Sequence, residues 1–361
     1  MYKKIILSLF INVFLLSACK KKEEAPTIKT TETTKTETFA SLIADAETTP
    51  VTSYNDAADD ACIWINPKDT LKSTIIGTNK KEGLEVYNLD GKRLFAYPIG
   101  RVNNVDIRDG FLLNGKKTSV VTATNRTHNS IAILYVKPTG ELEEVSARPI
   151  LSKIPKVYGL GMYKSIETNL FYVFIVGKEG EVEQWELFEN KAKIDAKIVR
   201  TFNLGSQGEG IVADDFHGKV YFGEEDKALW KYDAEPDAST ERILIARTTD
   251  KNMKDDFEGV TLYDAGNGKG HIIVSSQGNN SYAVFDRITN KYQGSFKINK
   301  GTNIDGTFDT DGIDVTSISF GTKYPKGFFI AQDGANTQNK DNLRQNFKIV
   351  DWQKIAAIFK R

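Results

Sequence analysis

The sequence predicts an all-β fold, a six-bladed β-propeller with roughly four strands per blade. An aromatic or β-branched run, a turn and a second such run recur at a spacing of about 50 residues, which is the period of propeller blades. Two shorter hydrophobic runs precede each copy, and helical periodicity is absent until residues 352–359. A two-sheet sandwich is the alternative, but it explains neither the even spacing nor the chain length.

The repeat can be followed along the chain in order. Its outer pair of runs falls at residues 84–97, 131–140, 182–202, 228–232, 281–296 and, as a partial copy, 346–350. The inner pair is clearest at residues 210–213 with 219–223, and at residues 259–262 with 271–275. Four runs per unit and roughly six units favour a propeller over other all-β arrangements.

The amino-terminal segment predicts export and lipid attachment. Lys3 and Lys4 precede an apolar stretch at residues 5–16 that is too short for an ordinary spanning helix. Residues 16–19, Leu-Ser-Ala-Cys, resemble a bacterial lipobox, in which Cys19 is lipidated. An ordinary secretory signal with a chance cysteine is the alternative. We expect a signal peptide at residues 1–18, a flexible tether at 19–44 and a propeller domain at 45–361.

These features predict a location in the bacterial cell envelope, with the protein anchored by lipid to the outer membrane. The Lys- and Glu-rich run at residues 20–24 resembles signals that send some lipoproteins to the cell surface. The tether is too poor in apolar residues to fold by itself.

Charge and cysteine content exclude several classes of protein. The chain has 48 basic and 48 acidic residues, which argues against a nucleic-acid partner. Cys62 is the one cysteine besides Cys19, so no disulfide can form within the mature chain and no cysteine-based zinc cluster exists. The three histidines are scattered. We expect a monomer with Cys62 buried as a small hydrophobic residue.

Polar residues gather where the predicted strands begin and end. One set opens the first strand of each unit, and the other closes the second strand. The opening set is Asp59, Asp60, Asn103, Asn104, Asp106, Tyr158, Glu209, Glu258 and Asp311; the closing set is Lys80, Lys81, Asn125, Arg126, Lys178, Glu179, Glu224, Glu225, Asp226, Gln277, Gln332 and Asp333. In an antiparallel pair these positions share one edge. A ring of such units would bring both sets to one face.

The acidic residues of this face predict a site for several Ca²⁺ ions. A solvated turn is the alternative for any single cluster, because Asp is common in turns. Carboxylates packed together repel unless they are neutralised, and Ca²⁺ accepts six to eight oxygen ligands. No His or Cys cluster points to zinc or copper, and the EF-hand spacing is absent, so the ligands would come from different blades.

The cations of the same face predict a phosphate ligand. Lys80, Lys81, Arg126 and Lys178 all follow an inner strand. Arg can bind phosphate through two parallel hydrogen bonds, and Lys acts as a point charge. A solvated loop cation is the alternative for each one alone. Phosphate-binding glycine loops and serine nucleophile elbows are absent from the sequence. We therefore expect hydrolysis by metal-activated water, held by Glu209 or Glu225.

With these residues in place, the sequence resembles the β-propeller phytases over residues 46–356. These are calcium-dependent secreted phosphatases that act on inositol hexakisphosphate, or phytate. The matching segments include Asp59-Asp60-x-x-Ile63-Trp64, Thr78-Asn79-Lys80-Lys81, Asn103-Asn104-Val105-Asp106, Val157-Tyr158-Gly159, Gly177-Lys178-Glu179-Gly180, Glu209-Gly210, Glu224-Glu225-Asp226, Ser275-Ser276-Gln277-Gly278-Asn279 and Asp309-Thr310-Asp311-Gly312. The family fold is a six-bladed propeller.

The resemblance implies a role for each matching residue. Those that hold calcium, or lie at calcium-linked positions, would be Asp60, Glu209, Glu225, Asp256, Glu258, Gln277, Asp305, Asp311 and Asp333. Those around two adjacent phosphate subsites would be Lys80, Lys81, Arg126, Tyr158, Lys178 and Glu179. The catalytic set would be Glu209, Glu225, Lys80, Arg126 and Tyr158. Two departures from the family pattern are Ala335, where a Glu is usual, and Ala61, where a Pro is usual. With Ala335 in this place, one calcium site of the family would lack a carboxylate ligand.

Three functions follow as hypotheses. The first is a lipid-anchored phytase that releases phosphate and lower inositol phosphates from phytate or its calcium complex. The second is another calcium-dependent propeller hydrolase, such as a lactonase, against which the phosphate-type cations argue. The third is a non-catalytic surface propeller that binds a polyanion.

Overall fold

The computed structural model describes residues 39–338 and 341–359. The predicted signal peptide, the lipidated Cys19 and the tether up to residue 38 lie outside the described residues. No helix in the described ranges is long and apolar enough to cross a membrane. The free Cys62 is buried, as expected.

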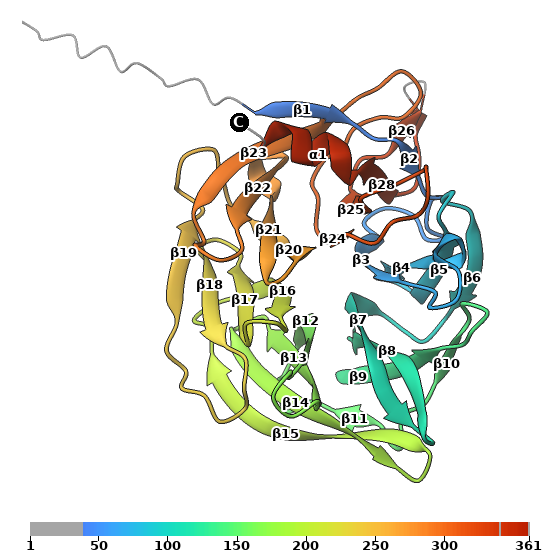
Figure 1. The fold of residues 1–361 in the computed structure, drawn as a ribbon, viewed down its shortest axis with the longest axis vertical. Coiled ribbons are helices and arrows are strands. Elements are labelled where there is room, and N and C mark those ends of the chain that lie inside the picture. The colour runs from blue at the N-terminus through green and yellow to red at the C-terminus, as the bar shows by residue number, and fades with distance from the viewer. Residues whose placement is uncertain (1–38, 339–340, 360–361) are drawn as a thin grey trace, which may run out of the picture. The chain divides into compact units, whose positions relative to one another are not determined.

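Six small sheets stand around a common axis and form a six-bladed propeller (Figure 1). The first blade consists of β3 (Ala58–Trp64), β4 (Thr74–Asn79), β5 (Gly83–Asn88) and β6 (Arg93–Tyr97). The second consists of β7 (Val102–Leu113), β8 (Lys116–Asn125), β9 (Ser130–Val136) and β10 (Leu142–Glu144), with β11 (Ile150–Leu151) beside β9. The third consists of β12 (Val157–Lys164), β13 (Phe171–Gly177), β14 (Glu181–Asn190) and β15 (Lys193–Asn203).

The other three blades complete the ring. The fourth blade consists of β16 (Gly208–Asp214), β17 (Lys219–Glu224), β18 (Ala228–Asp233) and β19 (Ile243–Arg247). The fifth consists of β20 (Phe257–Gly266), β21 (Lys269–Ser276), β22 (Ser281–Asp286), β23 (Tyr292–Asn299) and β1 (Ala40–Ile43). The sixth consists of β24 (Ile313–Thr316), β25 (Phe328–Asp333), β28 (Asn346–Asp351) and β2 (Ala46–Glu47). The short elements are β26 (Thr337–Gln338), β27 (Asp341–Asn342), two 3₁₀ turns at Thr70–Lys72 and Gln277–Asn279, and α1 (Trp352–Ile358). The predicted fold and the late short helix are confirmed.

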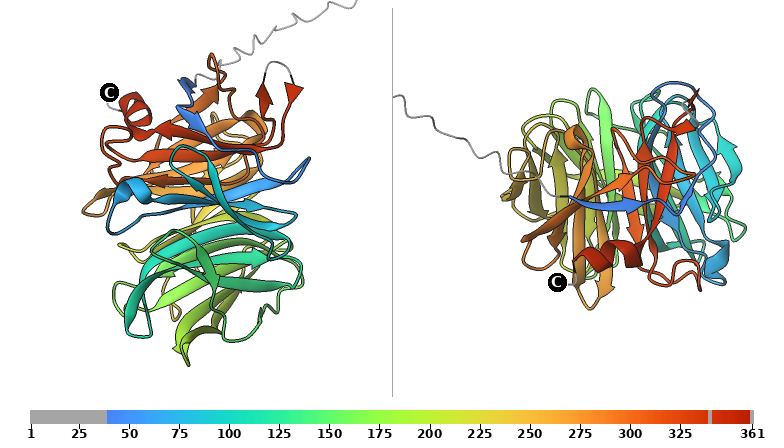
Figure 2. Two further views of the ribbon diagram at one scale, coloured as in Figure 1. Left: turned by 90° about the vertical axis from the view of Figure 1, so that its right-hand side faces the viewer. Right: turned by 90° about the horizontal axis from the view of Figure 1, so that it is seen from above.

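The first strand of every blade lies nearest the axis, and each of these inner strands packs beside the next around the ring (Figure 1). The blades are antiparallel throughout, apart from β1, which runs parallel to β23. The two edge-on views show the blades lying side by side in one layer (Figure 2). The loops therefore gather on two opposite faces of the ring.

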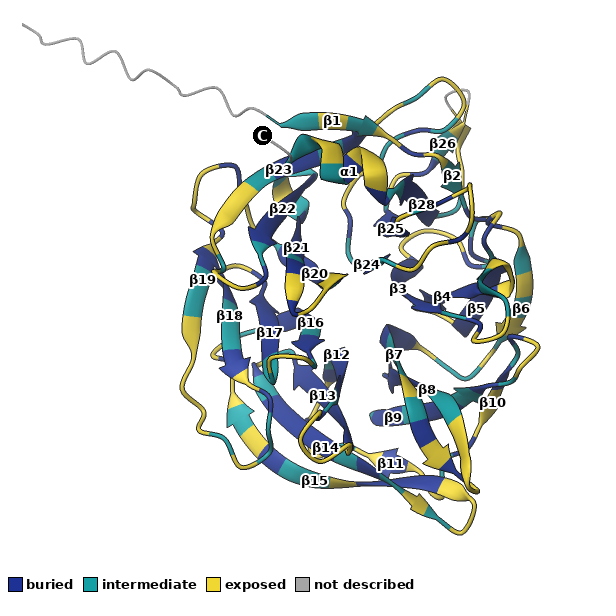
Figure 3. Ribbon diagram, in the orientation of Figure 1, coloured by how far each residue is buried: buried dark blue, intermediate teal, exposed yellow. Residues whose placement is uncertain are grey.

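The hydrophobic core is divided into six clusters, one between each pair of neighbouring blades. Ile75 and Ile76 in β4 show how this arises, because they are adjacent and fully buried but belong to different clusters. Successive side chains of a strand point to opposite faces, so a blade covered on both faces needs apolar residues at consecutive positions. Burial accordingly follows the middle strands, and exposure follows the rim and loops (Figure 3).

The ring is closed by strands from the amino-terminal side. β2 is the outermost strand of the last blade and pairs with β28, while β1 adds to the preceding blade through β23. The expected tether, residues 19–44, is therefore wrong at its end, since Ala40–Ile43 belong to a sheet. The prediction failed because a four-residue edge strand carries little hydrophobic pattern of its own.

Candidate active site

The opening and closing positions of the blades lie at the same edge, as the antiparallel geometry predicts. The residue that follows the second strand donates its backbone N–H to the carbonyl that precedes the first strand. This bond joins Lys80 to Ala57 (2.6 Å), Arg126 to Arg101 (2.6 Å), Glu225 to Gln207 (3.1 Å) and Gln277 to Asp256 (2.8 Å). Because the same bond recurs in four blades, the opening and the closing residues of these blades lie around one face of the ring.

A bulge at the start of the inner strand recurs in five blades. The register shifts between Ala58 and Ala61, Val102 and Val105, Val157 and Leu160, Gly208 and Ile211, and Phe257 and Val260. A bulge releases residues from the ladder and re-aims a side chain. The first residues released in this way are Asp59, Asn103, Tyr158, Glu209 and Glu258. The candidate site is therefore built on a repeated backbone irregularity, which periodicity in the sequence cannot show.

In three of these bulges, a glycine follows the residue whose side chain the bulge releases. This glycine allows the inner strands of neighbouring blades to approach each other closely. A Cβ on Gly210 would lie 1.9 Å from the carbonyl oxygen of Glu258, and one on Gly159 would lie 2.1 Å from that of Glu209. Neither glycine has a positive φ. The requirement is therefore for space between neighbouring blades, and this close approach brings carboxylates from different blades together.

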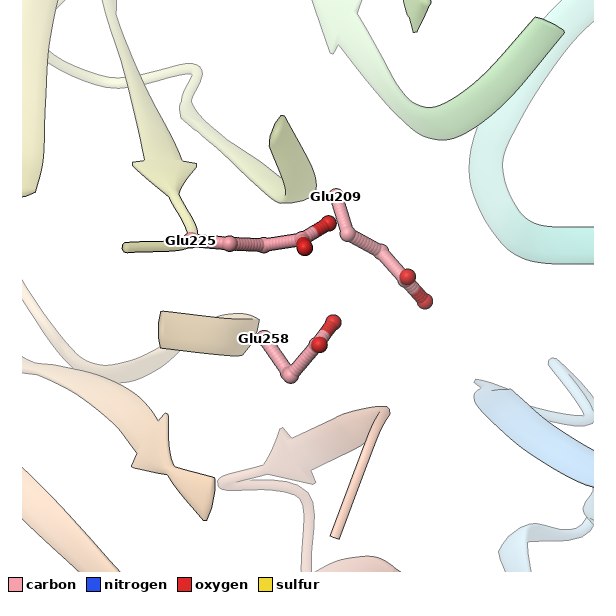
Figure 4. Close-up of side chains that lie close together, drawn as sticks. All are labelled: Glu209, Glu225 and Glu258. Carbon is pink, nitrogen blue, oxygen red and sulfur yellow. The ribbon is translucent and has the colours of Figure 1, made fainter. Parts of the chain in front are cut away.

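Three glutamates from two neighbouring blades meet at this face (Figure 4). One carboxylate oxygen of each of Glu209, Glu225 and Glu258 lies within 4.8 Å of the others. Their exposed fractions are 2%, 9% and 6%. Burial, and then the nearby negative charges, raise the pKa of Glu209 and Glu258, and burial raises the pKa of Glu225 to about 7.

The donor set fits a hard cation. Glu258 Oε2 and Asp59 Oδ1 are buried and have no hydrogen-bond partner among the described residues. Unpaired buried oxygens of this kind are costly unless a cation or water binds them. All the donors are oxygens, which suits Ca²⁺ better than zinc. A second group of carboxylates, Asp226, Asp255 and Asp256, lies at the exposed rim.

Lys80 is embedded among acids at the edge of the carboxylate cluster. Its Nζ lies 2.6 Å from Asp56 Oδ1, 2.8 Å from Asp311 Oδ2 and 3.7 Å from Asp59 Oδ2. Although burial opposes the charge, Asp59 and Asp311 raise the pKa of Lys80 above its usual value. Gln277 Nε2 donates to Asp311 Oδ1 at 2.8 Å. Lys80, Asp311 and Gln277 are therefore brought together from three blades.

Tyr158 lies beside two of the predicted phosphate-binding cations. The Nζ of Lys178 is 4.1 Å from the centre of its ring, and the guanidinium carbon of Arg126 is 6.0 Å away. The charge of Glu209, followed by burial, raises the pKa of Tyr158 well above that of a free phenol. Its hydroxyl thus stays protonated and can donate to an anion between the two cations.

Three other predicted residues make no hydrogen bond or ion pair with the three glutamates among the described residues. Lys81 donates to the backbone oxygen of Tyr54, and Glu179 is exposed in the turn between β13 and β14. Asp60 is buried and accepts from Asn104 Nδ2 (3.2 Å) and the backbone N–H of Val105 (3.1 Å).

Asp305 and Asp333 surround a buried lysine. Lys348 Nζ lies 2.6 Å from Asp305 Oδ1 and 3.1 Å from Asp333 Oδ2. It also lies 2.6 Å from Glu47 Oε2, which joins the closing strand β2 to this group. In the described residues, no hydrogen bond or ion pair joins Asp305 or Asp333 to the three glutamates.

Three residues at the site were given no role from the sequence. Asn103 donates to Glu209 Oε1 at 3.1 Å, Gln207 donates to both oxygens of Glu225 at 2.8 and 2.7 Å, and Asp56 pairs with Lys80. Asn103 opens an inner strand like the acids around it, so its position was visible in the sequence. Gln207 and Asp56 precede their strands in irregular segments, where no periodic signal marks them.

The fold and the site define a class of protein, a six-bladed propeller in which three buried carboxylates gather on the same face as a tyrosine flanked by Arg and Lys side chains. The family model described as Phytase matches residues 3–361. The chain belongs to the phytase family. It is 47% identical over 322 residues to the 3-phytase of Bacillus subtilis (strain 168), a match that covers 87% of this chain and 84% of that protein.

Solved structures of lower identity share the architecture. A calcium-binding protein, regucalcin, from Agrobacterium tumefaciens str. C58 superimposes with a TM-score of 0.54 at 12% identity, over 86% of this chain and 95% of that one. At this level of identity the likeness shows the fold alone.

Proposed function

We propose that the protein is a calcium-dependent phosphomonoesterase that removes phosphate from phytate. The observation that carries this proposal is the adjacency of the three buried glutamates to Arg126 and Lys178, which both lie against the Tyr158 ring. Asn103 links Arg126 to Glu209. The charge of Lys178 acts on Glu225. Membership of the phytase family and 47% identity to a 3-phytase support it. The products would be inorganic phosphate and lower inositol phosphates.

The residues divide the work of hydrolysis between them. Arg126 would hold oxygens of the phosphate that is cleaved, and the Tyr158 hydroxyl would donate to the same group. Lys178 would hold a neighbouring phosphate of the same ligand. Glu209, Glu225 and Glu258 would hold calcium and orient the attacking water in line with the bond to be broken. Bound calcium would supply charge that lowers the pKa of this water and offsets the charge that develops on the phosphoryl oxygens. Lys80 is well placed to neutralise Asp59 and Asp311 at the edge of the cluster.

A lactonase-like activity fits the same fold less well. A lactone carries no charge, so it needs no Arg and Lys beside the carboxylates. The two cations that contact the Tyr158 ring, one from β8–β9 and one from β13–β14, therefore favour a polyanionic substrate.

The decisive assay measures phosphate release from phytate by the purified propeller, with calcium and with excess chelator. We expect turnover with calcium and none with chelator. Hydrolysis that persists in chelator would contradict the calcium requirement. Absence of phosphate release under both conditions would contradict the activity itself.

We further propose that Cys19 carries lipid and anchors the propeller to the cell envelope as a monomer. The lipobox at residues 16–19 supports this proposal. Cell fractionation of a Cys19→Ala variant tests it: the variant should move from the membrane to the soluble fraction. A variant that stays as firmly in the membrane fraction as the parent would exclude lipid attachment at Cys19.

A further inference from the structure

One buried amide lies between the anion site and the carboxylate cluster. Asn103, at the start of β7, has no exposed surface. Arg126 Nη1 donates to its Oδ1 at 2.5 Å, and its own Nδ2 donates to Glu209 Oε1 at 3.1 Å. A single side chain thus connects the guanidinium expected to hold phosphate with a carboxylate from a blade two places further along the ring.

The chemistry of the two partners determines how the amide is oriented. An arginine can only donate hydrogen bonds, and an ionised carboxylate can only accept them. The amide carries both an acceptor and a donor, so Oδ1 must face Arg126 and Nδ2 must face Glu209. Its second N–H is taken by Asn104 Oδ1 at 3.0 Å. An aspartate in this place could not donate to Glu209, and an apolar residue could serve neither partner.

We propose that Asn103 is a positioning residue that couples Arg126 to Glu209 and so sets the separation between the bound phosphate and the carboxylate cluster. Because Asn103 has no exposed surface, it acts through these two groups and does not touch the substrate. The identity of the anion rests on the function proposed above, whereas the coupling rests on the two hydrogen bonds. In-line attack depends on this separation, and a misplacement of about 1 Å can lower a rate about 100-fold.

The first test compares Asn103→Ala with a matched control. Asn66→Ala removes another buried asparagine, which follows β3 at the end of the strand away from the site. Its Oδ1 accepts from the backbone N–H groups of Lys68 and Asp69 in the loop between β3 and β4. Asn103→Ala should lower kcat/KM for phytate between about 10-fold and 100-fold. Asn66→Ala should lower the melting temperature and keep kcat/KM. Equal kcat/KM for Asn103→Ala and the parent would overturn the proposal.

A double-mutant cycle separates positioning from a general loss of structure. If Asn103 acts through Arg126, the loss caused by Asn103→Ala should be at least several-fold smaller in an Arg126→Ala background. Losses that simply multiply would overturn the link to Arg126. The variant Asn103→Asp retains an acceptor for Arg126 and loses the donor to Glu209. It should keep KM near the parental value and lower kcat, whereas a KM as high as that of Asn103→Ala would also contradict the link.

Binding measurements keep this inference separate from the proposed function. A parent enzyme that releases no phosphate from phytate would refute the function. In that event, calorimetry with Ca²⁺ and thermal shifts with inorganic phosphate still test the coupling. Asn103→Ala should bind both ions at least several-fold more weakly than the parent, and Asn66→Ala should bind both like the parent. Parental affinities for both ions in Asn103→Ala would overturn the proposal.

Discussion

At the scale of single residues, the site contains buried carboxylates that have few hydrogen-bond partners. Glu258 Oε2 has no hydrogen-bond partner in the described part of the chain, and Glu225 has only the amide of Gln207. Buried carboxylates without a cation keep their protons to higher pH than exposed ones do. The glutamates therefore predict both a requirement for a cation and a particular dependence of stability on pH.

Replacing Glu209 or Glu225 by glutamine should affect turnover far more than folding. Each change keeps the shape of the side chain and removes one charge from the cation site. We expect kcat for phytate to fall by about 100-fold or more, which corresponds to about 2.7 kcal/mol in the barrier. The melting temperature in chelator should stay at or above that of the parent, because a repulsive charge has been removed. Near-parental kcat in both variants would rule out their proposed roles.

Without calcium, the protein should lose stability as the pH rises from about 4.5 to about 7. Burial raises the pKa of Glu225 to about 7, and burial followed by the charge of Asp59 raises that of Asp311 to about 7. Between about pH 4 and pH 7 the folded state therefore holds protons that the unfolded chain has released. The free energy of unfolding is highest below about pH 4 and falls as the pH rises to about 7. At about 1.36 kcal/mol per pKa unit, each of the two groups should contribute a loss on the order of 3 to 4 kcal/mol.

Thermal melts in chelator at pH 5 and at pH 7.5 measure this effect. The melting temperature should be lower at pH 7.5, and Glu225→Gln should reduce the difference. With saturating calcium the order should reverse, because the metal binds deprotonated carboxylates. A melting temperature in chelator that rises between pH 5 and 7.5 would contradict the prediction.

At the scale of the elements, two features of the blades position the site. Their middle strands are buried on both faces, which holds each blade rigidly between two hydrophobic clusters. The bulge at the start of the inner strand then releases one side chain toward the cluster. Close packing of neighbouring inner strands is possible because glycine follows the aimed residue, as Gly210 does after Glu209.

Gly210→Ala should therefore destabilise the propeller by on the order of 3 kcal/mol, since its Cβ would overlap the carbonyl oxygen of Glu258. Urea unfolding measures the change. Gly115→Asn is the control, because a Cβ at Gly115 meets nothing within 4 Å and asparagine tolerates its φ of +70°. The control should change stability by less than about 1 kcal/mol. Equal losses in the two variants would contradict the role of close packing.

At the scale of the whole molecule, the ring is what makes a site from distant segments. Lys80, Arg126 and Lys178 come from three consecutive blades, and the glutamates come from the next two. Such a face can contact several phosphates of one ligand at once. The closing strand β2 contributes Glu47 to the buried Lys348, so ring closure also links the two ends of the described chain by charge.

The enzyme should therefore prefer phytate to a simple monoester. Phytate can place one phosphate at the carboxylate cluster and a neighbouring phosphate at a second subsite, which orients the first for attack. We expect kcat/KM for phytate to exceed that for p-nitrophenyl phosphate by about 100-fold or more. Lys178→Gln should reduce this preference more than it reduces monoester turnover. Comparable kcat/KM values in the parent would refute the two-subsite arrangement.

The sequence alone determined the fold, the family and the edge on which the site lies. Hydrophobic runs without alternation follow from strands buried on both faces, and the period of about 50 residues follows from the four strands of a blade. Because antiparallel strands turn back at a fixed edge, the opening residue Glu209 and the closing residues Arg126 and Lys178 had to share one face.

Tertiary structure decided which of these residues meet. The meeting of Glu209, Glu225 and Glu258 depends on bulges and on the approach of separate blades, and neither leaves a periodic signal. The strand β1 lay within the expected tether because an edge strand is stabilised by the sheet that it joins. Asn103 lay in a recognised set, but its bonds to Arg126 and Glu209 join residues 23 and 106 positions away. Contacts between such distant residues exist only once the ring has closed.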